Sequence, residues 1–191
     1  MKRFFIASLL IACLLGAALS STPLRGAAQT GEMPIYEVNI KLHGIDGKFY
    51  DIAEMKGNVL LVSFGATWCS PCTVELRALE ELRAEYRDQP VKFLWVSIDR
   101  REQLSDSGLR DFVKEHKLTF PVLRDPTQLT YAQFSTRTRL PYVVFFDKEG
   151  KLAAPKHVGM TQPEEYKKII RDNLNKLLTV EPKEAAASSA K

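Results

Sequence analysis

The feature that most constrains this chain is a pair of cysteines, Cys69 and Cys72, placed where a predicted strand gives way to a predicted helix. The preceding residues 59–64 form a short apolar run, which is typical of a strand buried on both faces of a sheet. Residues 70–86 carry apolar side chains at three- and four-residue steps with charges between them, which indicates an amphipathic helix. A Cys-x-x-Cys pair at such a junction favours a redox dithiol.

Strand and helix patterns continue to alternate along the rest of the chain. Further strands are expected at about 36–42, 91–98, 142–146 and 151–158, helices at about 109–116, 125–134 and 163–178, and turns at 44–47 and 147–150. This order predicts one α/β domain over residues 35–180, with a central mixed sheet and helices on both faces. Residues 181–191 are small and polar, and we predict a disordered tail there.

The first 28 residues have the layout of an export signal. Lys2 and Arg3 precede an uncharged, mostly apolar run over residues 4–19, and small residues follow it. This layout predicts a cleaved signal peptide, with an uncleaved membrane anchor as one alternative. A lipoprotein acylated at Cys13 is the other alternative, since residues 10–13 are similar to a lipobox. All three interpretations predict a periplasmic or extracytoplasmic domain, and two of them tether it to the membrane.

The charge of the chain excludes functions that need a strongly basic protein. There are 27 Lys and Arg against 23 Asp and Glu, a formal net charge of +4. Lys2, Arg3 and Arg25 lie in the first 28 residues, where there is no acid, so 24 positive and 23 negative side chains remain, a net +1. We therefore predict no nucleic-acid partner.

The cysteine count separates a reactive disulfide from a structural one. Only Cys69 and Cys72 remain if Cys13 is removed with the signal or carries a lipid. An exported pair is expected to form a disulfide, but so short a loop adds little stability, which favours a reactive bond over an inert one. A zinc site needs four ligands, and the three histidines of the chain show no paired spacing. We predict no metal, and no cofactor beyond the redox-active Cys69–Cys72 disulfide.

Thiol-disulfide exchange assigns different tasks to the two cysteines. The start of a helix lowers the pKa of a thiol placed there, which favours Cys69 as the nucleophile. Cys72 lies one turn further along the same face and is the natural resolving thiol. Glu75 follows three residues later. It either accepts the proton of Cys72, if burial raises the pKa of its carboxyl, or complements the helix dipole.

Two further positions flank this chemistry. Trp68 directly precedes Cys69, and it either packs in the core or shields the dithiol. Leu140-Pro141 precedes the strand expected at 142–146. A proline at the start of a strand is ordinary, and base rates predict a trans peptide bond before it.

The segment from Gly57 to Cys72, together with residues 46–48, 140–141 and 146–151, resembles the thioredoxin superfamily over roughly residues 35–178. It looks most like the exported TlpA/ResA-type thiol-disulfide oxidoreductases. The resemblance implies a thioredoxin-like fold for residues 35–180, with Cys69 as nucleophile and Cys72 as resolving thiol.

The resemblance also implies roles for residues outside the dithiol. Pro141 would be a cis-proline that faces the dithiol beside backbone that binds substrate, and Leu140 would help to select partners, with Trp68 in the same substrate-binding group. Glu75 matches an acid that TlpA/ResA-like proteins carry. Ser63 departs from the buried Asp of cytosolic thioredoxins, which leaves the proton path to Glu75.

The resulting hypothesis is an exported protein-disulfide reductase. Its expected clients are disulfide-containing proteins such as apocytochrome c or copper-site proteins, and its electrons would come from a membrane thiol donor. A thiol peroxidase-like enzyme is one alternative, although Thr67 lies two residues before Cys69 instead of at the spacing of those enzymes. A Sco-like copper-binding protein is another, although the cysteines are one residue too close and His157 would have to supply a ligand.

Overall fold

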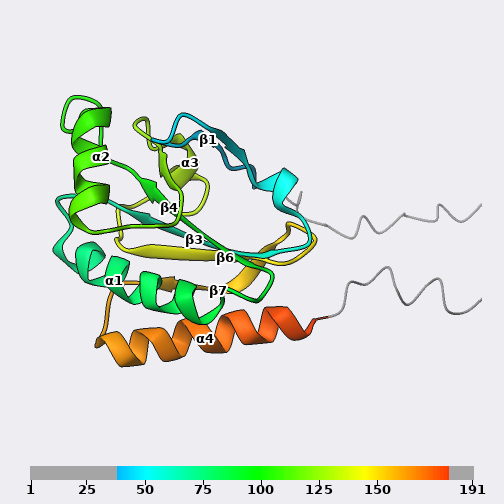
Figure 1. Cartoon of the computed structure of the whole chain (residues 1–191). Helices are drawn as coiled ribbons and strands as arrows, with labels where there is room; N and C mark the ends of the chain where they lie inside the picture. The colour runs from blue at the N-terminus through cyan, green and yellow to red at the C-terminus, as the bar shows by residue number, and fades with distance from the viewer. Residues whose placement is uncertain (1–37, 181–191) are drawn as a thin grey trace, which may run out of the picture. The chain divides into compact units, whose positions relative to one another are not determined.

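A five-stranded sheet with the strand order β5-β4-β3-β6-β7 forms the centre of the computed structural model, which describes residues 38–180 (Figure 1). The strands β3, β4 and β5 run parallel, and β6 and β7 are antiparallel to their neighbours, so the sheet is mixed, as predicted. The strands are β3 (Val59–Gly65), β4 (Val91–Ser97), β5 (Val122–Arg124), β6 (Tyr142–Phe146) and β7 (Leu152–Val158).

Helices and a small hairpin cover the two faces of this sheet (Figure 1). The long helices α1 (Ser70–Glu85) and α4 (Pro163–Thr179) lie side by side on one face, together with α2 (Asp106–Glu115). The other face is covered by α3 (Leu129–Ala132) and by β1 (Lys41–His43), β2 (Phe49–Asp51) and the 3-10 helix η1 (Ile52–Met55). The prediction of helices on both faces is confirmed.

The central strand β3 is buried along its whole length, as the apolar run predicts. Val59 and Leu61 point toward α1 and α4, whereas Leu60 and Val62 point into the opposite layer. Ser63 is the one polar side chain of the strand and is also fully buried. A buried hydroxyl needs a hydrogen-bond partner, so β3 brings a polar group into the layer shared with α1 and α4.

The last residue of β3 must be a glycine because a bulky neighbour lies against it. A Cβ atom at Gly65 would lie 2.6 Å from Nε1 of Trp95. Trp95 is itself fully buried in β4 and stacks with Phe112 of α2. This close approach lets the chain leave β3 toward the first turn of α1 without displacing the indole ring.

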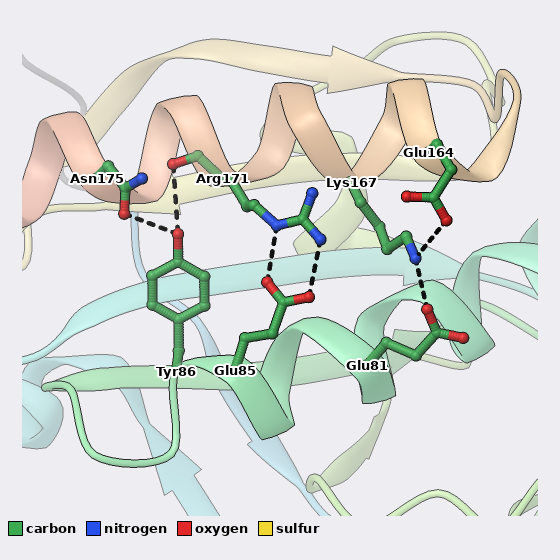
Figure 2. A network of polar contacts seen from close by, with 7 residues as sticks. All are labelled: Glu81, Glu85, Tyr86, Glu164, Lys167, Arg171 and Asn175. Carbon is green, nitrogen blue, oxygen red and sulfur yellow. Dashed lines mark hydrogen bonds and ion pairs between the residues drawn. The ribbon is translucent and has the colours of Figure 1, made fainter.

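Helix α4 is fixed on α1 by apolar packing and by polar side chains (Figure 2). Leu79 and Leu82 of α1 and Ile170 and Leu174 of α4 are buried in one cluster. Ion pairs and a hydrogen bond span the edge of this contact: Lys167 with Glu81 at 2.6 Å, Arg171 with Glu85 at 2.7 Å and Tyr86 with Asn175 at 2.8 Å.

The structure contains two short strands that the sequence did not predict, and one predicted helix is shorter than expected. The strands β2 and β5 were not predicted, because three residues are too short to show an alternating pattern. The helix expected over 125–134 shrinks to α3, because Gln128 has a φ of 59° and this left-handed backbone conformation interrupts a helix before Leu129.

The predicted signal and tail segments, 1–28 and 181–191, lie outside the described residues. The described part of the strand expected at 36–42 pairs only from Lys41 onward, in β1. Among the helices of residues 38–180, none has the length and apolar character needed to span a membrane.

Candidate active site

Cys69 and Cys72 are joined by a disulfide at the N-terminal end of α1, with a Cα–Cα distance of 5.2 Å. Cys69 is the N-cap residue, and its sulfur accepts a hydrogen bond from the backbone N–H of Cys72 at 3.2 Å. Pro71 lies in the first turn, where a helix makes no use of the missing N–H. Cys69 keeps 6% of its surface exposed and Cys72 none, so Cys69 is the sulfur that a partner molecule can reach.

The carboxyl group of Glu75 lies one helical turn after Cys72 and has no exposed surface. Burial raises the pKa of this carboxyl from 4.5 to about 7, while hydrogen bonds from two hydroxyl groups act in the opposite direction. Tyr166 donates to Oε1 at 2.6 Å and Ser63 donates to Oε2 at 2.8 Å. A helix-dipole role needs no burial, so this environment favours a proton acceptor over that alternative.

Tyr166 and Ser63 are contacts of the site that the sequence did not predict as partners of Glu75. The periodicity of α4 predicts that Tyr166 is buried, but not that its hydroxyl reaches a residue 91 positions earlier. The sequence contains a weak indication of a polar contact at Ser63, because a lone hydroxyl in a buried apolar strand requires a hydrogen-bond partner. Both hydroxyls converge on Glu75 only once β3, α1 and α4 have packed together.

A second buried acid, Asp99, holds the loop that leads into Cys69. It accepts hydrogen bonds from the backbone N–H of Thr67 at 3.0 Å and from the Thr67 hydroxyl at 2.9 Å. The hydroxyl of Ser97 donates to the same carboxylate at 2.8 Å. The Thr67 hydroxyl, which the peroxidase alternative would use, is thus bound to Asp99. The loop after β3 enters α1 in a fixed conformation for this reason.

Trp68 is 57% exposed, which excludes the alternative that it packs in the core. The residue lies in the loop between β3 and α1, which Asp99 holds at the edge of the sheet through its neighbour Thr67. The indole therefore adds an apolar surface directly beside Cys69. The alternative that Trp68 shields the dithiol stays a prediction.

The Leu140–Pro141 peptide bond is cis, so the trans expectation from base rates is wrong and the isomer is the one the resemblance implies. Pro141 precedes β6, whose first residue, Tyr142, pairs with Phe64 near the end of β3. Pro141 consequently lies at the same edge of the sheet as the start of α1. Leu140 is half-buried against the apolar cluster that contains both cysteines.

His157, the ligand that a copper site would require, lies in β7 against Tyr166. The two ring centroids are 5.2 Å apart, and Nε2 of His157 is buried without a hydrogen-bond partner in the described structure. Burial lowers the pKa of this imidazole, which keeps it neutral. Across residues 38–180 there is no cluster of three or more His, Cys, Asp or Glu side chains that could hold a metal ion.

The sheet order, the disulfide at the start of α1 and the proline loop beside it together define a thioredoxin-like fold with a Cys-x-x-Cys disulfide at the first turn of its long helix. A family model described as the AhpC/TSA family matches residues 34–154, and the chain belongs to this family.

Relatives and solved structures agree with this assignment. The chain is 29% identical over 114 residues to the thiol-disulfide oxidoreductase ResA of Bacillus cereus, covering 60% of this chain and 63% of the relative, which is just under two thirds. It is 27% identical over 149 residues to ResA of Halalkalibacterium halodurans, covering 77% and 80%. A crystal structure of a putative thiol:disulfide interchange protein DsbE from Chlorobium tepidum aligns with a TM-score of 0.65 and 21% identity, over 74% of this chain and 94% of that chain.

The predicted thioredoxin-like fold is confirmed, and the relatives named thiol-disulfide oxidoreductase agree with the predicted enzyme class. The likeness to the DsbE structure bears on the fold alone. The activity of the whole protein, the functions of the individual site residues, the clients and the cellular location stay predictions.

Proposed function

We propose that this chain is an exported enzyme that reduces disulfide bonds of client proteins through Cys69 and Cys72. The observation that carries the proposal is the disulfide at the first turn of α1, with 6% of Cys69 and none of Cys72 exposed, and the buried Glu75 one turn beyond Cys72. We assign client binding to Trp68, Leu140 and Pro141, which all lie at the end of the sheet where α1 begins. The disulfide itself serves as the redox group.

The first half of the reaction forms a mixed disulfide. The thiolate of reduced Cys69 attacks one sulfur of the client disulfide, and a bond forms between these two sulfurs. The second client sulfur leaves as a thiolate and takes a proton from water. Attack through Cys69 follows from its exposure and from its place at the helix N-terminus, where the N–H groups stabilise a thiolate.

The second half releases the client and uses Glu75. The thiol of Cys72 gives its proton to the carboxylate of Glu75, and the resulting thiolate attacks the sulfur of Cys69. The remaining client sulfur leaves and is protonated, and the Cys69–Cys72 bond forms again. Two electrons have passed to the client, and a dithiol donor must return them. A carboxyl with a pKa of about 7 suits this transfer, because it exchanges protons near neutral pH.

The finer assignments rest on the sequence. The N-terminal pattern supports export, and an exported reductase needs an electron source across the membrane, so a membrane thiol donor is the proposed partner. Disulfide-containing proteins, with apocytochrome c and copper-site proteins as examples, are the proposed clients.

The redox potential of the Cys69/Cys72 pair tests the proposal. The protein is equilibrated in graded thiol/disulfide buffers, quenched in acid and alkylated to give the oxidised fraction. We expect a reversible two-electron transition near or below about −270 mV, the value of thioredoxin. A potential near about −120 mV, as in DsbA, would make the protein an oxidant of its clients instead. Absence of a transition would refute the oxidoreductase assignment.

Trapping of a client intermediate tests the order of the two steps. Cys72→Ser should accumulate a mixed disulfide with an oxidised client, because the resolving sulfur is missing. Cys69→Ser is the matched control and should trap no client, because the sulfur it retains is fully buried. Peroxide consumption and copper retained after dialysis, measured on the same preparations, decide the two alternative functions.

A further inference from the structure

We propose that Tyr166 is a positioning residue of the active site, whose hydroxyl holds the carboxylate of Glu75 in place to receive the proton of Cys72. The inference rests on the proposed function and extends it to the C-terminal helix. Helix α4 then contributes to the chemistry as well as to the packing of the sheet.

The geometry of the contact is that of a dedicated pair. The side chains of Tyr166 and Glu75 are both without exposed surface, and the Oη–Oε1 distance is 2.6 Å. The other carboxylate oxygen is held by Ser63 at 2.8 Å. Each oxygen of Glu75 thus has one hydroxyl donor, from α4 on one side and from β3 on the other. This arrangement fixes the carboxylate against rotation and stabilises its charged form.

Among the described residues, no positively charged side chain stabilises the carboxylate of Glu75 in addition to these two hydroxyls. Lys167, the next residue of α4, binds Glu81 at 2.6 Å and Glu164 at 2.7 Å (Figure 2). His157 of β7 faces the ring of Tyr166 and stays neutral because burial lowers its pKa. Cys72 of α1 is disulfide-bonded. The negative charge of Glu75 is therefore stabilised by Tyr166 and Ser63, and loss of one donor removes half of this support.

The position of Tyr166 is set by the contacts on either side of it. The ion pairs of Lys167 with Glu81 and of Arg171 with Glu85, shown in Figure 2, join α4 to α1 just beyond the Tyr166 contact. The ring of His157 packs against the ring of Tyr166 from the sheet side. A tyrosine held in this way directs its hydroxyl at Glu75 in the folded protein at no further cost in side-chain entropy.

Tyr166→Phe tests the inference, with Tyr86→Phe as its matched control. Both substitutions remove one tyrosine hydroxyl from the α1–α4 contact, but the hydroxyl of Tyr86 binds Asn175 instead of Glu75. The titration of Glu75 is followed in the oxidised full-length protein by the carboxyl ¹³C NMR signal. In Tyr166→Phe the midpoint should rise by about one pH unit, a tenfold change in protonation, because a hydrogen bond to a charged group is lost. Tyr86→Phe should titrate like the parent protein.

Two further variants keep the test decisive. Ser63→Ala removes the other donor and should shift the midpoint in the same direction, which guards against a local rearrangement at Tyr166. In a Glu75→Gln background, the pH profile of thiol-disulfide exchange should no longer respond to Tyr166→Phe. An unshifted midpoint in Tyr166→Phe, or a shift of equal size in Tyr86→Phe, would overturn the inference.

The NMR titration also separates this inference from the proposed function. A parent protein without exchange activity would refute the proposed reductase, whereas the midpoint of Glu75 would still report on Tyr166. An active parent with coincident titrations in Tyr166→Phe would refute the positioning role and leave the reductase standing.

Discussion

Single buried polar groups determine the local structure around the disulfide. Glu75 and Asp99 are both carboxylates in an apolar setting, a placement that is unfavourable unless their oxygens accept hydrogen bonds. Glu75 binds two hydroxyls, and Asp99 binds the loop before Cys69 through the backbone N–H and the hydroxyl of Thr67, and β4 through the hydroxyl of Ser97. One acid is therefore suited to exchange a proton, while the other positions the loop that carries Trp68.

Gly65→Ala should destabilise the protein by about 1–3 kcal/mol, because the new methyl group would overlap the buried ring of Trp95. Urea denaturation of the oxidised protein measures the change. Gly108→Ala is the control: its Cβ would meet the end of the flexible Leu104 side chain at 2.9 Å and the hydroxyl of Ser105 at 3.4 Å, and alanine favours a helix. A Gly65→Ala protein as stable as the parent would contradict the packing of Trp95 described above.

At the level of whole elements, the contact between α1 and α4 combines apolar and charged groups of unequal importance. Ile170 and Leu174 are fully buried, whereas Arg171 and Glu85 keep 33% and 42% of their side-chain surface exposed. Burial of apolar surface dominates such a contact, and exposed ion pairs add little. The ion pairs instead join the two helices just beyond the contact of Tyr166 with Glu75.

Two adjacent substitutions in α4 separate these contributions. Ile170→Ala should cost about 2–5 kcal/mol of unfolding free energy, since it leaves a cavity in the core. Arg171→Ala should cost less than about 1 kcal/mol, and this cost should shrink further in high salt. Thermal or chemical denaturation at two salt concentrations measures both. Equal losses in the two variants would mean that charge, and not apolar burial, fixes α4 on the sheet.

The elements that the sequence predicts well are the long and regular ones. The strands β3, β4 and β6 and the helices α1 and α4 follow clear hydrophobic patterns, and the cysteine pair marks the start of α1. The short strand β5 and the single turn of α3 depend on tertiary contacts and on the backbone of Gln128, which leave no periodic pattern. The bond from Tyr166 to Glu75 joins residues 91 positions apart, so only the packed fold reveals it.

For the whole molecule, the buried acid makes stability depend on pH. Folding raises the pKa of Glu75 from 4.5 to about 7, so the folded protein binds this proton more tightly than the unfolded chain. The stabilisation is complete below about pH 4.5 and is lost as the pH rises through about 7. The ordinary behaviour of acids with lowered pKa values, such as Glu81 and Glu85, has the opposite sign.

Glu75→Gln should remove this dependence. Between pH 4 and pH 8 the parent should lose about 3 kcal/mol of unfolding free energy through Glu75, because the folded protein holds this proton more tightly than the unfolded chain. The variant has no such group, so its unfolding free energy relative to the parent should rise by the same amount over this range. Denaturant titrations of both oxidised proteins across that range give the difference, in which the contributions of the other acids cancel. A difference that stays constant with pH would show that Glu75 titrates normally.

The place of Tyr166 in the C-terminal helix bears on the order in which the protein becomes functional. The chain is synthesised from its N-terminus, so the two cysteines emerge long before the tyrosine that binds Glu75, 91 residues behind it. Until α4 docks, Cys69 and Cys72 are both present, but Glu75 lacks the hydrogen bond from Tyr166 and keeps only the one from Ser63. Docking of α4 thus completes the hydrogen bonding of the candidate active site.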